Sequence, residues 1–274
     1  MFRLYYNFVK KSIPALVLGS FLLSAVPVLA VEPTDPGFDS QQVLWKQIGA
    51  SQAWEYTTGS KRVTVAIIDT GADIWNEDLK PNVWTNPYEI PDNGYDDDNN
   101  GYVDDIHGWN FIENSGDVRT SVLENKDDPD AIIHGTVIAG LVGAVGNNNK
   151  SGVGLNWKVQ IMPLRAIGSD GSGYFSNVMK AIRYAMDNGA DVIGMSMVGD
   201  KTDSRLKDLL YEAYKKGIVV VAAAGNDQAD GLGNLNTNPL YPVCLDQNDK
   251  ENWILGVSSV DANDHLSRFA DYGK

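Results

Sequence analysis

Residues 63–71 read Val-Thr-Val-Ala-Ile-Ile-Asp-Thr-Gly. The first six are apolar or β-branched, which is typical of a strand buried on both faces of a parallel sheet. The run stops at Asp69, and Gly71 permits a turn directly after it. In open parallel sheets, reactive side chains gather just beyond the carboxyl ends of the strands. Asp69 is therefore a candidate functional residue as well as a candidate turn residue.

Outward from this run, strand-like and helix-like stretches alternate. The sequence predicts further strands at 159–167, 191–197, 218–224 and 253–260, and helices at 132–145, 176–189 and about 204–216. Ser176 is the expected cap of the second helix, and Gly189 its end. This alternation predicts an α/β fold of three layers, a mostly parallel sheet with helices on both faces. Residues 31–62 are expected to form a lead-in segment, irregular over 32–42.

The composition excludes several classes of protein. The chain has 274 residues, a formal net charge of −14, 43% hydrophobic residues and one cysteine. The apolar fraction is too high for a disordered chain, and one cysteine cannot form an internal disulfide. The excess of acidic residues argues against nucleic acid as a partner, because binding it requires cations that neutralise phosphates. The length suits one large domain, or at most two.

The first 30 residues resemble a secretory signal peptide. Arg3, Lys10 and Lys11 precede an apolar run at 13–29, and small or aliphatic residues lead to Ala30, the expected cleavage site. We therefore expect a secreted or periplasmic protein without stable membrane insertion after signal cleavage. An N-terminal membrane anchor is the alternative, but this run is short and contains two prolines.

Three short motifs contain the candidate catalytic residues. Asp69 ends the strand at 63–68, His134 opens the stretch His-Gly-Thr-Val-Ile-Ala-Gly, and Asn226 follows Ala-Ala-Ala-Gly. Each has an ordinary structural reading. A carboxylate at a strand end is usually a turn residue, a histidine before a helix is often a cap, and asparagine after glycine is a turn former. The combination in this order is far more specific than any one of them.

Together these motifs resemble the subtilisin-like serine protease (subtilase) family, with the thermitase-like secreted bacterial members most similar. The resemblance implies a serine-type endopeptidase that hydrolyses polypeptide substrates outside the cytoplasm and acts as a monomer. It assigns Asp69 to orienting the imidazole of His134, and His134 to acting as general base and then general acid. It makes the side-chain amide of Asn226 a hydrogen-bond donor to the tetrahedral oxyanion. An α/β-hydrolase esterase is excluded, because there the nucleophile comes first in the chain.

The resemblance also implies a substrate cleft. Gly171, Ser172 and Gly173 would form an edge strand that pairs with the substrate backbone. The segment Ser196, Met197 and Val198 would form the opposite wall. Val198 stands where the family usually has glycine, so this sequence does not reveal the preferred substrate side chain.

The nucleophile of the family lies in a Gly-Thr-Ser-Met-Ala motif, and none of the seventeen serines of this chain has that context. We therefore expect residues 63–274 to be an incomplete peptidase domain whose C-terminal part is missing, and the 274-residue chain alone to be inactive. The alternative is a non-catalytic calcium-binding fragment or pseudoenzyme of the same fold.

An acidic insertion at 87–110 resembles a calcium loop. Asp96, Asp98 and Asn100 occupy positions 1, 3 and 5 of an EF-hand pattern, with glycine at position 6 and the carbonyl of Tyr102 at position 7. His107 stands at position 12, where an EF-hand has glutamate, so Asp104 or Asp105 must complete the ligand set. The structural alternative is a solvated acidic turn.

A second calcium site follows from the resemblance alone. The corresponding ligands would be Asp35, Asp78, Asn149 and the carbonyls of Ser151 and Val153. The loop at 147–153 is one residue longer than in thermitase-like members, so Asn148 remains an alternative to Asn149. Calcium at both sites would be structural.

Overall fold

A computed structural model describes residues 31–120 and 129–273; the expected signal peptide lies outside these residues. Its centre is one six-stranded sheet in the order β2-β3-β1-β4-β5-β6, and every neighbouring pair is parallel. The strands are β1 Gly59–Asp69, β2 Trp109–Asn110, β3 Lys158–Arg165, β4 Val192–Met195, β5 Val219–Ala223 and β6 Ile254–Val257. The predicted parallel sheet is thus confirmed.

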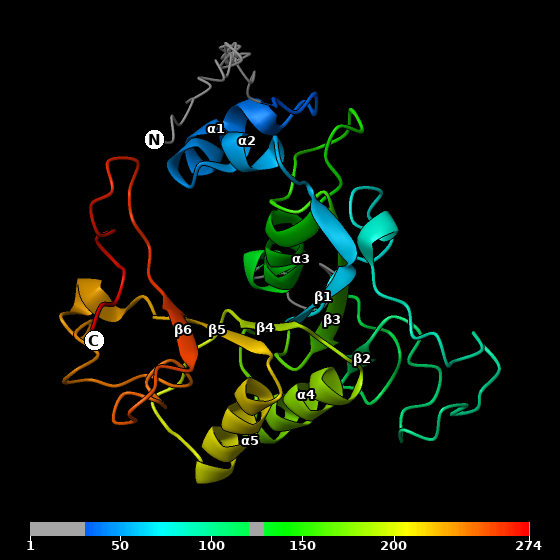
Figure 1. Ribbon diagram of the computed structural model, residues 1–274. Coiled ribbons are helices and arrows are strands. Elements are labelled where there is room, and N and C mark those ends of the chain that lie inside the picture. Colours follow the sequence, from blue (N-terminus) through cyan, green and yellow to red (C-terminus); the bar gives the residue numbers. More distant parts are fainter. Residues whose placement is uncertain (1–30, 121–128, 274) are drawn as a thin grey trace, which may run out of the picture.

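Helices cover both faces of the sheet (Figure 1). Helix α3 (Pro129–Gly143) packs on β1 and β3, whereas α4 (Phe175–Asp187) and α5 (Ser204–Lys215) lie together on the opposite face. Side chains alternate along β1 accordingly. Ile67 belongs to the core beneath α3, while Ala66 and Ile68 belong to the larger core beneath α4 and α5. The continuous apolar run of β1 therefore reflects burial on both faces.

The first part of the chain is more ordered than the sequence predicts. Helices α1 (Phe38–Gln47) and α2 (Ala50–Trp54) replace the expected irregular segment. The reason is an aromatic cluster, in which Trp54 lies 6.3, 5.8 and 5.2 Å from the rings of Phe38, Trp45 and Trp157. Trp157 lies just before β3, so these contacts fix both short helices to the sheet. Single-sequence periodicity does not reveal a cluster formed across more than 100 residues.

Several predicted boundaries are corrected. β1 begins four residues earlier than expected, at Gly59, which pairs with Lys158 before a register shift. The N-cap of α4 is Tyr174 and not Ser176, and no side chain among the residues described caps this helix. In α5, by contrast, the carboxylate of Asp203 accepts a hydrogen bond from the N–H of Arg205 at 2.9 Å.

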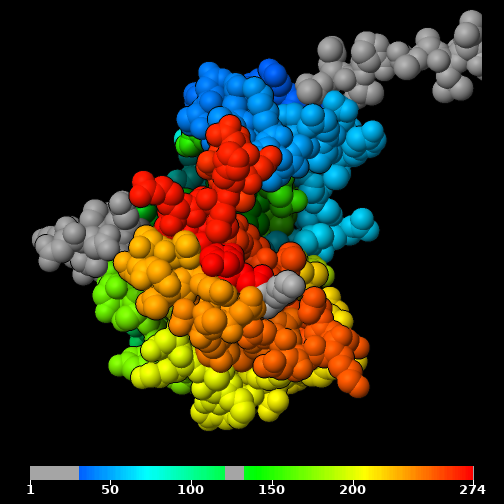
Figure 2. All heavy atoms as spheres, turned by 90° about the vertical axis from the view of Figure 1, so that its left-hand side faces the viewer, coloured from blue at the N-terminus to red at the C-terminus, as the bar shows by residue number. Residues whose placement is uncertain are grey.

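The C-terminal part of the described chain folds back towards α1. The side chain of Gln47 donates to the carbonyl of Asp261 at 2.7 Å and to Oδ1 of Asp264 at 2.6 Å. Figure 2 shows this segment, in red, reaching the blue N-terminal helices. Residues from both ends of the described chain therefore meet on one side of the molecule.

The two faces of β5 differ in burial, which gives a matched test of the fold. Val220 is 1% exposed in the core beneath α5, whereas its neighbour Val219 is 49% exposed on the other face. We expect Val220→Ala to lower the free energy of unfolding by about 2 kcal/mol, because two buried methyl groups and their packing are lost. Val219→Ala should change it by less than about 0.5 kcal/mol. Urea unfolding monitored by circular dichroism measures both, and equal losses would contradict this placement of β5.

Candidate active site

Three candidate segments lie along the carboxyl edge of the sheet. Ile68 of β1 pairs with Met195 of β4, and Met195 pairs with Ala222 of β5, so the three strands end at nearly the same level. Asp69, the last residue of β1, thus lies beside Ser196, the first residue after β4. Asn226 comes shortly after the end of β5. Neighbouring strands are about 4.8 Å apart, so β1 and β5 lie about 10 Å from each other. This is the edge at which reactive groups are expected in a parallel sheet.

The structure brings Asp69 and His134 into direct contact. Nδ1 of His134 lies 2.8 Å from Oδ1 and 3.0 Å from Oδ2 of Asp69. The carboxylate is 4% exposed and the imidazole 45%, so the acid is buried and the base faces solvent. The N–H of Thr70 donates to Oδ1 of Asp69 at 2.7 Å and so helps to fix the orientation of the carboxylate. Because Nδ1 faces the acid, Nε2 is the nitrogen available for proton transfer.

Gly135 makes this contact possible. A Cβ atom at this position would lie 2.1 Å from the carbonyl oxygen of Gly71 and 3.1 Å from Oδ1 of Asp69. Its backbone N–H donates to Oγ1 of Thr70 at 3.1 Å. The glycine after His134 therefore allows the first turns of α3 to approach the end of β1.

The environment of His134 favours its charged form. The hydrogen bond to Asp69 raises the pKa of the imidazole above its ordinary value of 6.5, and the negative charge of the carboxylate adds to this, whereas partial burial opposes it. Imidazole accepts and returns protons in the physiological pH range, so its contact with Asp69 suits a general base.

Asn226 is exposed at the start of a short 3₁₀ helix, η2 (Asp227–Asp230). Its backbone has φ −132° and ψ 23°. Its side-chain amide forms no hydrogen bond with the residues that the structure describes, and is thus available as a donor. The structure places it on the same sheet edge as Asp69, as the motif predicts.

The two predicted walls of the cleft follow β3 and β4. Ser196 and Met197 are half-buried and Val198 is 39% exposed. The prediction of an edge strand for the opposite wall is wrong. Residues 171–173 do not form an extended edge strand but an exposed turn after β3, with a single antiparallel bridge between Ile167 and Gly173. The carbonyl of Ser172 already accepts a hydrogen bond from Gly168, because Gly171 adopts φ 76° and turns the chain back.

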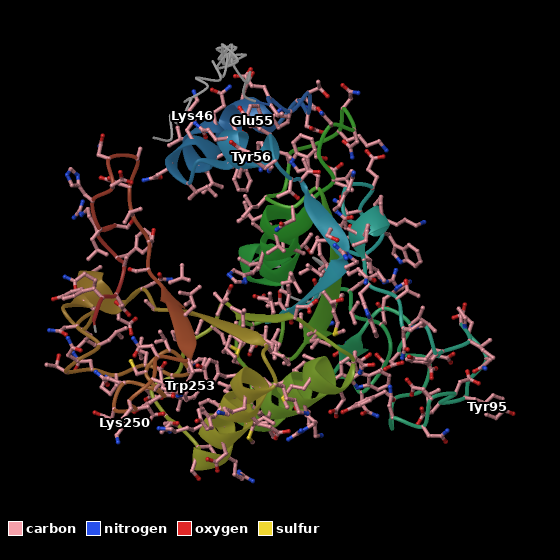
Figure 3. All side chains as sticks on the ribbon, viewed as in Figure 1. Lys46, Glu55, Tyr56, Tyr95, Lys250 and Trp253 are labelled. Carbon is pink, nitrogen blue, oxygen red and sulfur yellow. The ribbon has the colours of Figure 1, made fainter. Side chains whose placement is uncertain are left out.

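The acidic insertion extends away from the sheet, with Tyr95 near its tip in Figure 3. Asp96 and Asp98 lie together within it and accept hydrogen bonds from the backbone N–H of Asn100, both at 3.0 Å. Asp105 is fully buried and accepts hydrogen bonds from Asn100 at 2.9 Å and from the hydroxyl of Tyr184 at 2.6 Å. Of the two alternatives for completing the ligand set, Asp105 is the one connected to Asp98, because the amides of Asn86 and Asn100 each donate to both carboxylates.

Asp104 points elsewhere, because its carboxylate accepts hydrogen bonds from the backbone N–H groups of Asn93 and Gly94 at 3.1 and 2.9 Å. The side chain of Tyr102 packs on Trp109 and Tyr184, with ring centroids 5.0 and 5.1 Å apart. Only its backbone carbonyl thus remains a possible ligand.

Sequence reasoning missed Glu89. It is 8% exposed, and one oxygen from each of Glu89, Asp96 and Asp98 lies within 4.8 Å of the others. Oε1 of Glu89 accepts hydrogen bonds from the N–H groups of Asp97 and Asp98 at 2.8 and 3.2 Å, while Oε2 is buried with no partner among the described residues. Because Ca²⁺ binds oxygens at about 2.3–2.6 Å, ligands around one ion lie within about 5 Å of each other. The donor set and its spacing therefore fit calcium.

The second predicted metal site is assembled only in part. Asp35 accepts hydrogen bonds from the backbone N–H groups of Asn147 and Asn148, and Nδ2 of Asn148 donates to Oδ1 of Asp78 at 2.8 Å. Asn149 is exposed, so the geometry favours Asn148 over the predicted residue. Oδ2 of Asp78 is buried without a partner in the described part of the chain.

The two predicted carbonyl ligands of this site already accept hydrogen bonds. The oxygen of Ser151 accepts from the N–H of Gly37, and that of Val153 from Gln41 at 3.2 Å. Ser151, Val153 and Asp78 line one cavity of about 210 Å³.

Comparison with known proteins shows the family of this chain. The model of the subtilase family matches residues 60–274. The chain belongs to the subtilase family. It is 34% identical to thermitase of Thermoactinomyces vulgaris over 241 residues, which cover 88% of this chain and 70% of thermitase. It is 31% identical to a thermophilic serine proteinase of Bacillus sp. (strain AK1), covering 88% of this chain and 49% of that protein.

A solved protease of Pseudoalteromonas arctica PAMC 21717 has the same fold, with a TM-score of 0.64 and 28% identity; the match covers 89% of this chain and 70% of that one. Subtilases are serine peptidases, and their substrates are polypeptides. None of the helices among the described residues is long and apolar enough to cross a membrane.

The contact between Asp69 and His134 predicts a specific titration. In Asp69→Asn the pKa of His134 should fall towards or below 6.5, because the charged acceptor at Nδ1 is lost. The folded chain with Asp69 binds the His134 proton more tightly than the unfolded chain. The resulting stabilisation is thus fully present below pH 6.5 and is lost as the pH rises through the raised pKa.

NMR titration of the imidazole measures this shift directly. Asp261→Asn is the control, since Asp261 lies 3.7 Å from the exposed ring of His265 and should leave His134 unchanged. An identical His134 pKa with and without Asp69 would contradict the contact.

Proposed function

We propose that this protein is a subtilisin-like serine endopeptidase that acts outside the cytoplasm, with Asp69, His134 and Asn226 in its active site. The single observation that carries the proposal is the buried Asp69 carboxylate bonded to Nδ1 of a half-exposed His134. A buried acid, an oriented imidazole and a free amide on one sheet edge form three parts of an acyl-transfer site. Membership of the subtilase family and the predicted leader at 1–30 support the proposal independently.

In the proposed mechanism each group has one step. Nε2 of neutral His134 accepts the proton of a serine hydroxyl as the hydroxyl oxygen attacks the substrate carbonyl carbon. Asp69 stabilises the resulting imidazolium, and the amide of Asn226 donates to the oxyanion. The imidazolium then returns its proton to the leaving amine as the peptide C–N bond breaks. Water repeats the sequence and releases the acyl group from the serine.

The nucleophilic serine is the part that these residues do not supply. Ser196 directly follows the adjacent strand β4, beside Asp69, but it lacks the Gly-Thr-Ser context of the family. A pseudoenzyme or calcium-binding fragment therefore remains the second candidate, favoured by that same observation.

Replacement of His134 tests the proposal. In the whole mature protein, we expect His134→Ala to lower kcat for a fluorogenic peptide by about 10⁴-fold or more, as losses of triad members do in subtilisin. His265→Ala is the matched control, since this exposed histidine lies in a turn outside the candidate site. The activity of this variant should equal that of the unaltered protein. Equal activities of all three proteins would contradict the assignment.

A fluorophosphonate probe separates the two candidate functions. We expect it to label a serine of the whole mature protein but none of the 274-residue chain. Absence of labelling in both would favour the pseudoenzyme, and labelling of Ser196 would contradict its assignment to the cleft wall.

We also propose that structural calcium binds the acidic insertion, with Glu89, Asp96, Asp98 and Asp105 among the ligands. Buried and clustered carboxylates repel one another without a cation, and Glu89 and Asp105 both have pKa values raised by burial. Flexible carboxylates and carbonyls suit Ca²⁺ better than Mg²⁺, which demands a rigid octahedron. The Asp35 and Asp78 region is proposed as a second site, with Asn148 in place of Asn149.

Charge-neutral variants test the loop site. Calcium at 100 times its dissociation constant should stabilise the fold by about 2.7 kcal/mol, if it binds only the folded chain. Glu89→Gln and the double variant Asp96→Asn, Asp98→Asn should lose this gain and bind one ion fewer in calorimetric titration. Asp92→Asn removes an exposed charge of the same loop and should retain both. An unchanged stoichiometry in all variants would identify the loop as a solvated acidic turn.

A further inference from the structure

A buried carboxylate lies against the turn that carries Asn226. Asp271 is 0% exposed, and its Oδ1 accepts a hydrogen bond from the backbone N–H of Asp227 at 2.7 Å. Its own N–H donates to the carbonyl of Gly225 at 3.1 Å. Asp271 therefore contacts the residues immediately before and after Asn226, although it lies about 45 positions further along the chain.

The backbone is fitted closely to this carboxylate. Gly225 has φ 118°, and a Cβ atom there would lie 2.3 Å from Oδ2 of Asp271. A side chain at residue 225 would thus displace the acid. Oδ2 has no hydrogen-bond partner among the described residues, which makes the burial of this charge costly. Desolvation accordingly raises the pKa of Asp271, with the nearby charge of Asp227 adding to the rise.

The segment that carries Asp271 is itself held in place. The hydroxyl of Ser258, just after β6, donates to the carbonyl of Asp271 at 2.6 Å. The N–H of Gln228 donates to the carbonyl of Phe269 at 3.1 Å. Asp271 thus connects the end of β6 to the turn after β5, so the position of that turn depends on a fixed part of the sheet.

The side chain of Asn226 has no comparable support. It is exposed and forms no hydrogen bond with a described residue, so the direction of its amide depends on the backbone at residues 225–228. We propose that Asp271 is a positioning residue, whose buried carboxylate holds this turn and so aims the Asn226 amide at the oxyanion. The inference rests on the proposed protease function, because only that function gives the amide a target.

Kinetics of the whole mature protein test the coupling between the two residues. We expect Asp271→Ala to lower kcat about tenfold with KM changed less than twofold, since the oxyanion forms only in the transition state. Asp271→Asn keeps an acceptor oxygen at the same place and should restore most of the rate. Asp264→Ala, in an exposed turn of the same segment, is the control and should retain full activity.

A double variant separates positioning from general damage. Asn226→Ala should lower kcat by about 10²- to 10³-fold, the range known for the corresponding donor in subtilisin. If Asp271 acts through Asn226, adding Asp271→Ala should lower kcat no further. Independent, multiplying losses would overturn the inference. If Asp271→Ala does not fold, Asp271→Ser replaces the carboxylate with a smaller polar group, and the same comparison of single and double variants applies.

Amide hydrogen exchange in the 274-residue chain gives a readout that needs no catalysis. The Asp227 amide should exchange at least tenfold faster in Asp271→Ala and at the original rate in Asp271→Asn, while amides of β1 stay unchanged. If the Asp227 amide responds in this way but neither the unaltered protein nor any variant hydrolyses the peptide, the proposed protease function is refuted. The contact between Asp271 and the turn would still stand. An unchanged Asp227 amide in Asp271→Ala would overturn the inference itself.

Discussion

The contact between the end of β1 and the first turns of α3 is the constraint on which the site depends. β1 must end at Asp69, and α3 must approach near enough for Nδ1 of His134 to lie 2.8 Å from its carboxylate. Gly135 permits this approach, because its missing Cβ leaves room for the carbonyl of Gly71. The hydrogen bond between Gly135 and Thr70 then fixes the two backbones at that distance. The geometry of the candidate site is thus set by backbone packing as much as by the two side chains.

Buried carboxylates recur as the supports of loops in this acidic protein. Asp35, Asp246 and Asp271 are nearly inaccessible, and each accepts hydrogen bonds from backbone N–H groups. Asp246, for example, accepts from Trp253 and Ile254 at 2.7 and 2.8 Å and so fixes the start of β6. Charged acceptors form stronger hydrogen bonds than neutral ones, which offsets part of the desolvation cost. One oxygen each of Glu89, Asp78 and Asp271 has no hydrogen-bond partner among the described residues, and the proposed calcium sites and the proposed role of Asp271 draw on this observation.

These supports follow from the architecture of a parallel sheet. The strands bring their carboxyl ends to one edge, but they say little about the loops that extend beyond it. The turn carrying Asn226, the acidic insertion and the loop at 147–153 each need a separate anchor, and each is held by a carboxylate. The sheet therefore determines at which edge the site lies, and the buried acids stabilise the conformation of its loops.

The sequence by itself determined the sheet, the three candidate motifs and the family. Apolar runs of the length of β1 and helices with a clear apolar face are local patterns, so they can be recognised without tertiary information. Asp69, His134 and Asn226 could be named because their motifs are short and contiguous.

Only the tertiary structure decided the remaining features. It showed α1 and α2, the turn at 171–173 and the hydrogen bond between Asn148 and Asp78. It also revealed Glu89 and Asp271 as buried acids, each with one oxygen that has no partner in the described part of the chain. Nothing in the residues near Asp271 indicates that its carboxylate meets the N–H of Asp227, because the sheet creates that contact across 44 positions. Burial and long-range hydrogen bonds depend on what lies on every side of a residue, and one stretch of sequence does not contain that information.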